Sequence, residues 1–178
     1  MTKTELETCI ETYGRDIYSF CRQLTKSVQE ADELYQDTFL KAVELNASIR
    51  SDHNPKSFLL SVAIRIWKNK RRKFAWRNRI AAMDAFPEGE VKTACHPEKS
   101  NPEQLILKQE EAAQIRHAVN RLPNRLKIPI LLFYMEDLST AQIAGILNIP
   151  DGTVKSRLHR ARTILKKDLE VIFDEIYG

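Results

Sequence analysis

The sequence predicts an all-α protein made of two small helical domains joined by a flexible linker. The 178 residues include only five Gly, and Leu, Ile, Ala, Lys and Glu are frequent, which favours helix over sheet. Apolar residues recur every three or four positions along most of the chain. A stretch near the middle is rich in Pro and has no such period. The length also suits two compact units.

The first two expected helices would pack by one face each. Between Glu5 and Lys26 the apolar positions form one helical stripe, which predicts either one helix or a pair of helices broken near Gly14. The next stretch, "EADELYQDTFLKAVEL", places Ala31, Leu34, Thr38 and Ala42 or Val43 on one side. Its outward face is acidic and polar, with Asp32, Glu33, Gln36 and Asp37.

A third helix is expected after Pro55, which suits a helix entry. The first half of "KSFLLSVAIRIWKNKRRKFAWRNRI" is apolar nearly all round, whereas its second half is strongly basic and must face solvent or a polyanion. Single-stranded bases bind where aromatic rings and cations alternate. Trp67, Phe74 and Trp76 could supply such rings, although Trp67 fits a core position equally well.

The linker is predicted at residues 85–104, between domains at 1–84 and 105–178. It holds three of the seven Pro, and its acidic residues outnumber its lysines. After it, the segments "PEQLILKQEEAAQIRHAVNRL" and "NRLKIPILLFYMEDL" have amphipathic helical patterns. Because Pro129 removes a hydrogen bond inside a helix, the second segment should either begin near Ile128 or kink there.

Two further helices are predicted around the turn "NIP". Ser139 and Gln142 have capping-box spacing, which indicates a helix start at Ser139. The next helix should begin near Pro150 or Asp151. Two short helices joined by a tight turn, with the second strongly basic, are typical of a helix-turn-helix.

The second helix of this pair has an apolar docking stripe and a polar outward face. The stripe consists of Val154, Leu158, Ala161 and Leu165. Arg, His and Ser side chains can bond base edges, Lys can neutralise phosphates, and the amides of Gly152 and Thr153 could approach a phosphate closely. The predicted DNA-binding residues are Gly152, Thr153, Lys155, Ser156, His159, Arg160 and Arg162.

Other functional classes find little support. Three Cys without a CxxC motif argue against a disulfide framework or a zinc knuckle and suit a reducing cytosol. No signal peptide or membrane-spanning run is visible. The four His accompany no metal-binding or nucleophile pattern, and there is no Gly-rich phosphate loop. We therefore expect no enzyme activity, metal, cofactor or small-molecule substrate, and a cytoplasmic location.

The motifs resemble those of bacterial sigma factors of the extracytoplasmic-function (ECF) group of the sigma-70 family. "LPNR", "DLSTAQIA" and "GTVKSRLHRAR" are similar to sigma region 4, and "EADELYQDTFLKAV" is similar to region 2.2, in the same order. The resemblance implies a subunit that binds core RNA polymerase and directs promoter-specific initiation in response to an envelope or extracellular signal. It also implies an anti-sigma factor as partner, often membrane-bound.

The resemblance also implies a role for each basic or acidic segment. The residues 152–162 named above would bind the -35 element, and the acidic face of the second helix would dock on polymerase. The -10 element would be bound by Arg65, Trp67, Lys68, Lys70, Arg71, Arg72 and Trp76. Arg65 stands where Asn is frequent in the family. The resemblance therefore does not identify the residue that reads the flipped base of the -10 element.

Two questions remain open at this point. The acidic linker would either approach the polymerase active site, as the resemblance implies, or act as a plain tether. There are two alternative functions. The protein could be a stand-alone helix-turn-helix regulator, or a polymerase-binding protein without promoter selectivity.

Overall fold

The computed structural model describes residues 3–45, 54–81 and 102–177, and every regular element within those ranges is an α-helix. The chain divides into two compact units, Met1–Thr93 and Ala94–Gly178, referred to below as the N-terminal and C-terminal units. The all-α prediction is confirmed. Residues 85–101 of the expected linker lie outside the described residues, so its boundaries and its role remain predictions.

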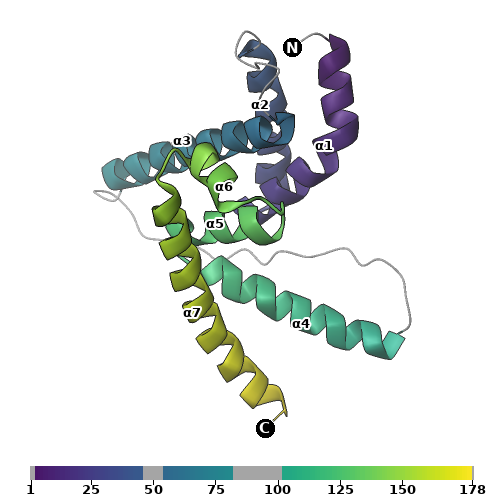
Figure 1. Ribbon diagram of the computed structural model, residues 1–178, viewed down its shortest axis with the longest axis vertical. Coiled ribbons are helices and arrows are strands. Elements are labelled where there is room, and N and C mark those ends of the chain that lie inside the picture. The colour runs from purple at the N-terminus through teal and green to yellow at the C-terminus, as the bar shows by residue number, and fades with distance from the viewer. Residues whose placement is uncertain (1–2, 46–53, 82–101, 178) are drawn as a thin grey trace. The chain divides into compact units, whose positions relative to one another are not determined.

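Three helices form the N-terminal unit: α1 (Lys3–Leu24), α2 (Val28–Glu44) and α3 (Pro55–Ala81). Each packs on the other two, and α3 lies across α1 and α2 (Figure 1). The apolar stripes predicted from the sequence meet in one core. Its largest fully buried side chains are Ile17, Phe20, Leu34, Leu59 and Leu60.

The first helix is continuous, so of the two alternatives, one helix or a pair broken near Gly14, the single helix is confirmed. Gly14 is buried, and a Cβ atom at this position would lie 2.8 Å from the Tyr35 hydroxyl oxygen. Glycine is therefore explained by the close approach of α2, and not by a break in α1.

The C-terminal unit contains α4 (Pro102–Arg121), α5 (Asn124–Tyr134), α6 (Thr140–Leu147) and α7 (Asp151–Tyr177). The last helix packs against each of the other three (Figure 1). Leu132 of α5, Ile143 of α6 and Val154 of α7 are completely buried. The unit is thus built around the N-terminal part of α7.

Helix α5 begins before Pro129 and continues through it. The Pro123 carbonyl accepts hydrogen bonds from the backbone amides of Leu126 (2.7 Å) and Lys127 (2.9 Å), which fixes the start at Asn124. Of the two alternatives, a start near Ile128 or a kink there, the late start was therefore wrong. Pro129 cannot donate the usual bond to the carbonyl of Arg125, but it is buried within an apolar helix whose packing compensates.

The predicted capping box and turn between α6 and α7 are confirmed. The Ser139 hydroxyl accepts from the Gln142 amide (3.3 Å), and the Gln142 side chain accepts from the Ser139 amide (2.9 Å). Asn148 ends α6 in the left-handed conformation (φ 52°), and the Ile149 amide donates to the Ala144 carbonyl (3.1 Å). This closed turn fixes the direction in which α7 starts.

Candidate nucleic-acid interface

Helix α7 docks by the predicted stripe and leaves its basic face exposed. Val154 and Ala161 are completely buried, Leu158 is 2% exposed, and Leu165 is half-buried. On the other side, five of the predicted DNA-binding side chains are exposed: Lys155, Ser156, His159, Arg160 and Arg162. The geometry is that of a recognition helix held by one face.

The N-terminus of α7 is open but carries its own ion pair. A Cβ atom added at Gly152 would meet nothing within 4 Å, so another molecule's backbone can approach here. Lys155 Nζ lies 2.7 Å from Asp151 Oδ2. Two hydrogen bonds lower the pKa of the Asp151 carboxyl group: the one from Lys155 has the larger effect and the one from Thr140 the smaller. Lys155 thus already has an anionic partner, which a bound phosphate would have to replace.

Two smaller residues at this end make backbone contacts. The Ser156 hydroxyl donates to the Thr153 carbonyl (3.0 Å), and Thr153 itself is half-buried. The Ser156 oxygen can still accept a hydrogen bond from a base edge. Ser156 is thus placed as predicted, while the Thr153 side chain contributes less exposed surface than expected.

Arg162, predicted as a DNA contact, is held against the end of α5. Its Nε donates to the Tyr134 hydroxyl (2.9 Å), and its Cζ lies 5.2 Å and 5.6 Å from the ring centroids of Phe133 and Tyr134. The sequence analysis missed Tyr134, because the two residues are 28 positions apart and no local pattern links them.

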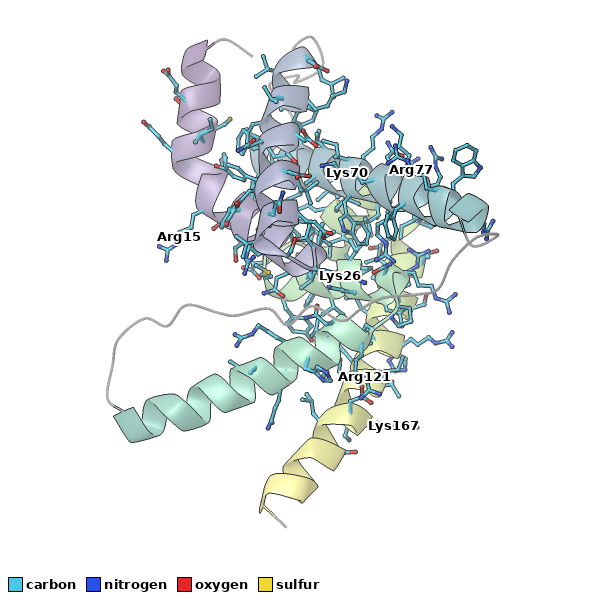
Figure 2. The ribbon with its side chains drawn as sticks, turned by 180° about the vertical axis from the view of Figure 1, so that it is seen from behind. Arg15, Lys26, Lys70, Arg77, Arg121 and Lys167 are labelled. Carbon is cyan, nitrogen blue, oxygen red and sulfur yellow. The ribbon has the colours of Figure 1, made fainter. Side chains whose placement is uncertain are left out.

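The second basic surface is on α3, and most of its predicted members are exposed. Figure 2 shows Lys70 and Arg77 along this helix. Phe74 and Trp76 are 66% and 65% exposed, respectively, so their rings are available for stacking. The exposed cationic residues predicted for this surface are Arg65, Lys68, Arg71 and Arg72.

Trp67 does not belong to the exposed aromatic surface. It is only 7% exposed and follows the buried residues Ala63 and Ile64 on the core side of α3. The Arg71 guanidinium carbon lies 5.0 Å from its ring centroid. Its assignment as a DNA-binding residue is therefore corrected: helical spacing continues the core stripe into the basic segment and includes Trp67 in it.

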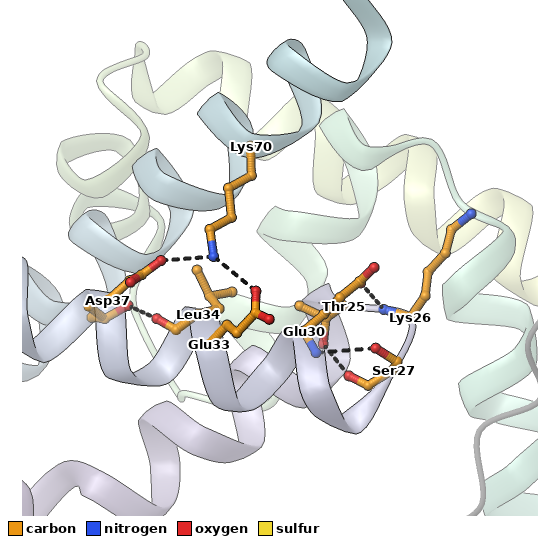
Figure 3. Close-up of polar contacts among 9 residues, drawn as sticks. Thr25, Lys26, Ser27, Glu30, Glu33, Leu34, Asp37 and Lys70 are labelled. Atoms are coloured by element: carbon orange, nitrogen blue, oxygen red, sulfur yellow. Dashed lines mark hydrogen bonds and ion pairs between the residues drawn. The ribbon is translucent and has the colours of Figure 1, made fainter. Parts of the chain in front are cut away.

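Lys70 points toward α2 instead of joining the other basic side chains. Its Nζ lies 2.8 Å from Asp37 Oδ2 and 3.6 Å from Glu33 Oε2 (Figure 3). Partial burial alone would lower the pKa of Lys70, but the hydrogen bonds and charges of Asp37 and Glu33 more than offset this effect and raise it. One residue predicted for DNA is thus paired with two predicted for polymerase.

The remaining acidic face of α2 is partly committed to the fold. Asp32 Oδ1 accepts a hydrogen bond from the Tyr18 hydroxyl of α1 (2.8 Å), and this bond is the main reason that the pKa of Tyr18 is raised. Gln36 is exposed beside it and lines a surface pocket of about 400 Å³ together with Asp32. Asp32 therefore has a structural partner that the sequence did not indicate.

An apolar residue extends this face of α2. Leu40 is 64% exposed and lies one turn after Asp37 and two turns after Glu33. The sequence analysis considered only the charged and polar residues of this face. Leu40 could have been found from its spacing, because it lies in helical register with Glu33 and Asp37.

Two other properties concern the described part of the chain only. Its side chains include no group of three or more His, Cys, Asp or Glu that could hold a metal ion. Within the same ranges, no helix combines the length and apolar character needed to cross a membrane.

Comparisons with known proteins agree with this arrangement of two helical units. Residues 9–77 match the family model for sigma-70 region 2, and residues 112–165 match the model for sigma-70 region 4. The first match spans most of α1 to α3, and the second includes the turn between α6 and α7. Together they define the class: a DNA-binding protein of two sigma-type helical units.

Relatives that align with most of the chain identify the group of sigma factors to which it belongs. The chain is 29% identical over 161 residues to the ECF RNA polymerase sigma factor SigW of Bacillus subtilis, covering 90% of this chain and 86% of that protein. It is 29% identical over 179 residues to the RNA polymerase sigma-H factor of Pseudomonas aeruginosa, covering 97% and 90%. The chain belongs to the sigma-70 family and is an ECF RNA polymerase sigma factor.

Solved structures support the fold. The sigma factor RpoE of Bartonella quintana, in complex with the anti-sigma factor NepR, matches with a TM-score of 0.74 and 24% identity, over 94% of this chain and 98% of that chain. CnrH, in complex with the cytosolic domain of CnrY, matches with a TM-score of 0.68 and 16% identity, over 96% and 90%.

Proposed function

We propose that this sigma factor directs core RNA polymerase to promoters by dividing recognition between its two units. Helix α7 would read the duplex -35 element, and the exposed half of α3 would engage the -10 element as it opens. The observation that carries the proposal is the docked helix α7, whose buried stripe presents Lys155, His159 and Arg160 outward.

Within α7, base reading is assigned to its first turns. Recognition helices contact base edges with their N-terminal residues, and Arg can bind guanine through two hydrogen bonds. Arg160 and His159 are exposed on the third turn, and the open N-terminus at Gly152 suits a phosphate. Arg160→Ala should therefore weaken discrimination among -35 variants by about 1 to 3 kcal/mol.

The -10 element is assigned to α3 beyond its core segment. Phe74 and Trp76 offer exposed rings among exposed cations, and this combination binds unpaired bases without needing a fixed duplex. The proposed set is Arg65, Lys68, Arg71, Arg72 and Trp76, with Phe74 added because of its exposure. We leave out Trp67, which is buried, and Lys70, whose ammonium group pairs with Asp37 and Glu33 of α2.

Polymerase docking is assigned to the exposed face of α2. Glu33, Gln36 and Asp37 give it an acidic and polar character, and Leu40 adds an apolar contact. A surface of this sign would repel DNA, so a protein partner fits it better. Asp32 contributes indirectly, because its bond to Tyr18 holds α2 against α1.

The cellular setting is proposed from the relatives. We expect a cytoplasmic, non-enzymatic factor that is held by an anti-sigma factor until an envelope or extracellular signal releases it. One structural match is the sigma factor RpoE bound to the anti-sigma factor NepR, and another is CnrH bound to the cytosolic domain of CnrY. A pull-down of the chain from its own cells would test this, with the product of an adjacent gene as the expected partner.

Run-off transcription with purified core polymerase tests the proposal. A pool of promoters randomised in both elements should yield transcripts only when both the chain and core polymerase are present. Asp37→Lys should reduce polymerase binding, whereas Glu11→Lys, the same reversal of charge at an exposed residue of α1, serves as the control. Sequence-specific DNA binding that is undiminished without polymerase would instead indicate a stand-alone regulator.

A further inference from the structure

The Arg162 side chain contacts the end of α5 in the absence of any ligand. One N–H group of its guanidinium bonds to Tyr134, and the rings of Phe133 and Tyr134, themselves 5.0 Å apart, lie beneath its charge. A guanidinium has five N–H donors, and the Tyr134 bond uses the one on Nε. The edge formed by the two terminal nitrogens keeps the fork geometry that matches a phosphate.

The position of Arg162 on α7 indicates which part of DNA it would meet. It lies seven residues after Lys155, which is about two turns, so both share one stripe with the exposed His159. That stripe faces the same way as the proposed recognition surface. Arg162 lies only two residues after Arg160, but its side chain is bonded to Tyr134 at the end of α5, so it is less free than Arg160 to reach a base edge. A backbone phosphate fits this place better than a base.

We infer that Tyr134 is a positioning residue that holds Arg162 ready to bind a phosphate of the DNA strand flanking the -35 element. This inference rests on the proposed function of α7. Tyr134 is the last residue of α5 and is 62% exposed, so its ring and hydroxyl lie at the surface, where DNA would approach. Because the long Arg side chain is already ordered, binding loses less conformational freedom than it would with a free side chain.

The alternative is that the contact only ties α5 to α7. An exposed cation resting on aromatic rings adds modestly to stability, so such a role is physically reasonable. The two roles differ in one measurable property. A phosphate contact releases counterions and so changes the salt dependence of DNA binding, which a purely structural contact does not.

The experiment measures the affinity of the full chain, assembled with core polymerase, for the promoter duplex selected above, at several salt concentrations. Arg162→Ala should lower the affinity to the same extent on all -35 variants and reduce the slope of log K against log salt by about 0.9. Tyr134→Phe removes only the hydroxyl, so it should lower the affinity about two- to threefold at unchanged slope, since the charge remains.

A double variant and a control complete the design. Tyr134→Phe should have no further effect in an Arg162→Ala background, because its role acts through that side chain. Tyr13→Phe, a half-buried Tyr in the N-terminal unit, is the matched control and should leave upstream binding unchanged. Thermal unfolding of each variant shows whether it is folded.

Three outcomes would overturn the inference. If Arg162→Ala lowered the thermal stability but left the DNA affinity and its salt dependence unchanged, Arg162 would only connect α5 to α7. Unequal losses among -35 variants would make Arg162 a base-reading residue. If Arg162→Ala does not fold, an unchanged affinity of Tyr134→Phe would be decisive against the role of Tyr134. Failure of the wild-type chain to select promoters with polymerase would instead refute the proposed function itself.

Discussion

Helices α3 and α7 have similar sequences in outline but use their basic residues differently. Both are long, and both combine an apolar stripe with many Lys and Arg. On α7, the buried stripe and the exposed cations separate cleanly, as the period of the sequence predicts. On α3, the core stripe continues into the basic segment at Trp67, and Lys70 turns to the acid groups of α2.

The difference shows that a basic segment is not by itself a binding surface. The basic half of α3 begins where the helix still packs on α2, so Trp67 and Lys70 contact the fold there while Arg65 and Lys68 are exposed. The basic residues of α7 lie opposite its docking stripe from the first turn onward. The neighbouring helices, more than the charge, decide which cations are available.

The largest expected effect comes from the two Trp of α3. Trp67→Ala should destabilise the N-terminal unit by about 3 to 5 kcal/mol, because it removes a buried aromatic side chain. Trp76→Ala should change the stability by less than about 0.5 kcal/mol, since that ring is 65% exposed. Urea unfolding followed by far-UV circular dichroism measures both. If both substitutions lowered the stability equally, the assignment of Trp67 to the core and of Trp76 to the surface of α3 would be contradicted.

The two units can be compared next through their helix caps. The Ser27 hydroxyl accepts from the Glu30 amide (3.1 Å) at the start of α2, as Ser139 does for Gln142 at the start of α6. Ser27→Ala and Ser139→Ala should each cost about 1 kcal/mol, in the N-terminal and the C-terminal unit respectively. Both Trp lie in the N-terminal unit, so fluorescence should detect only the first substitution. Aspartate at either position is the control that keeps the cap.

A smaller effect separates Lys70 from its neighbour Lys68. Lys68→Gln should lower the salt slope of promoter binding by the polymerase-bound chain by about one, whereas Lys70→Gln should leave the slope nearly unchanged. The Lys70 ion pairs are half exposed and should contribute at most about 1 kcal/mol to stability. Because the pKa of folded Lys70 is raised, that contribution is fully present below pH 10.5 and is lost as pH rises through the folded pKa. A slope change as large as that of Lys68→Gln would restore Lys70 to the DNA surface.

The smallest effect concerns Asp151 at the start of α7. Its lowered pKa means that its contribution to stability is present above pH 3.8, the ordinary value, and is lost as pH falls through the lower folded pKa. Asp151→Asn should therefore remove part of the acid sensitivity of the C-terminal unit. It should also tighten upstream DNA binding slightly, because it frees Lys155 and removes a negative charge. Thermal unfolding between pH 3 and 7 tests the first effect, and an unchanged acid profile would contradict it.

Local and periodic features of this chain could be predicted from the sequence, and long-range contacts could not. The Ser139 cap, the turn after α6 and the docking stripe of α7 depend on residues a few positions apart, so their pattern is visible in one segment. The contacts of Arg162 with Tyr134, of Lys70 with Asp37 and of Tyr18 with Asp32 join different helices. They depend on how the helices pack, which a one-dimensional pattern does not contain.

Gly14 and Pro129 illustrate the same limit. Both residues weaken isolated helices, so local propensity predicted a break at one and a late start or kink at the other. In the fold, the missing side chain of Gly14 admits the Tyr35 hydroxyl, and Pro129 is buried within α5. Tertiary packing outweighed propensity at both positions.

The central claim is that α7 acts on duplex DNA while the exposed half of α3 acts on opened DNA. The most direct measurement is the affinity of the polymerase-bound chain for a promoter duplex and for the same promoter with a pre-opened -10 region. Arg160→Ala should weaken binding to both by the same factor, whereas Trp76→Ala should impair strand opening on the duplex and also lose its stacking contact on pre-opened DNA. Strand opening is monitored in the same complexes with a fluorescent base in the -10 element. If Arg160→Ala and Trp76→Ala impaired strand opening equally, the claim would be contradicted.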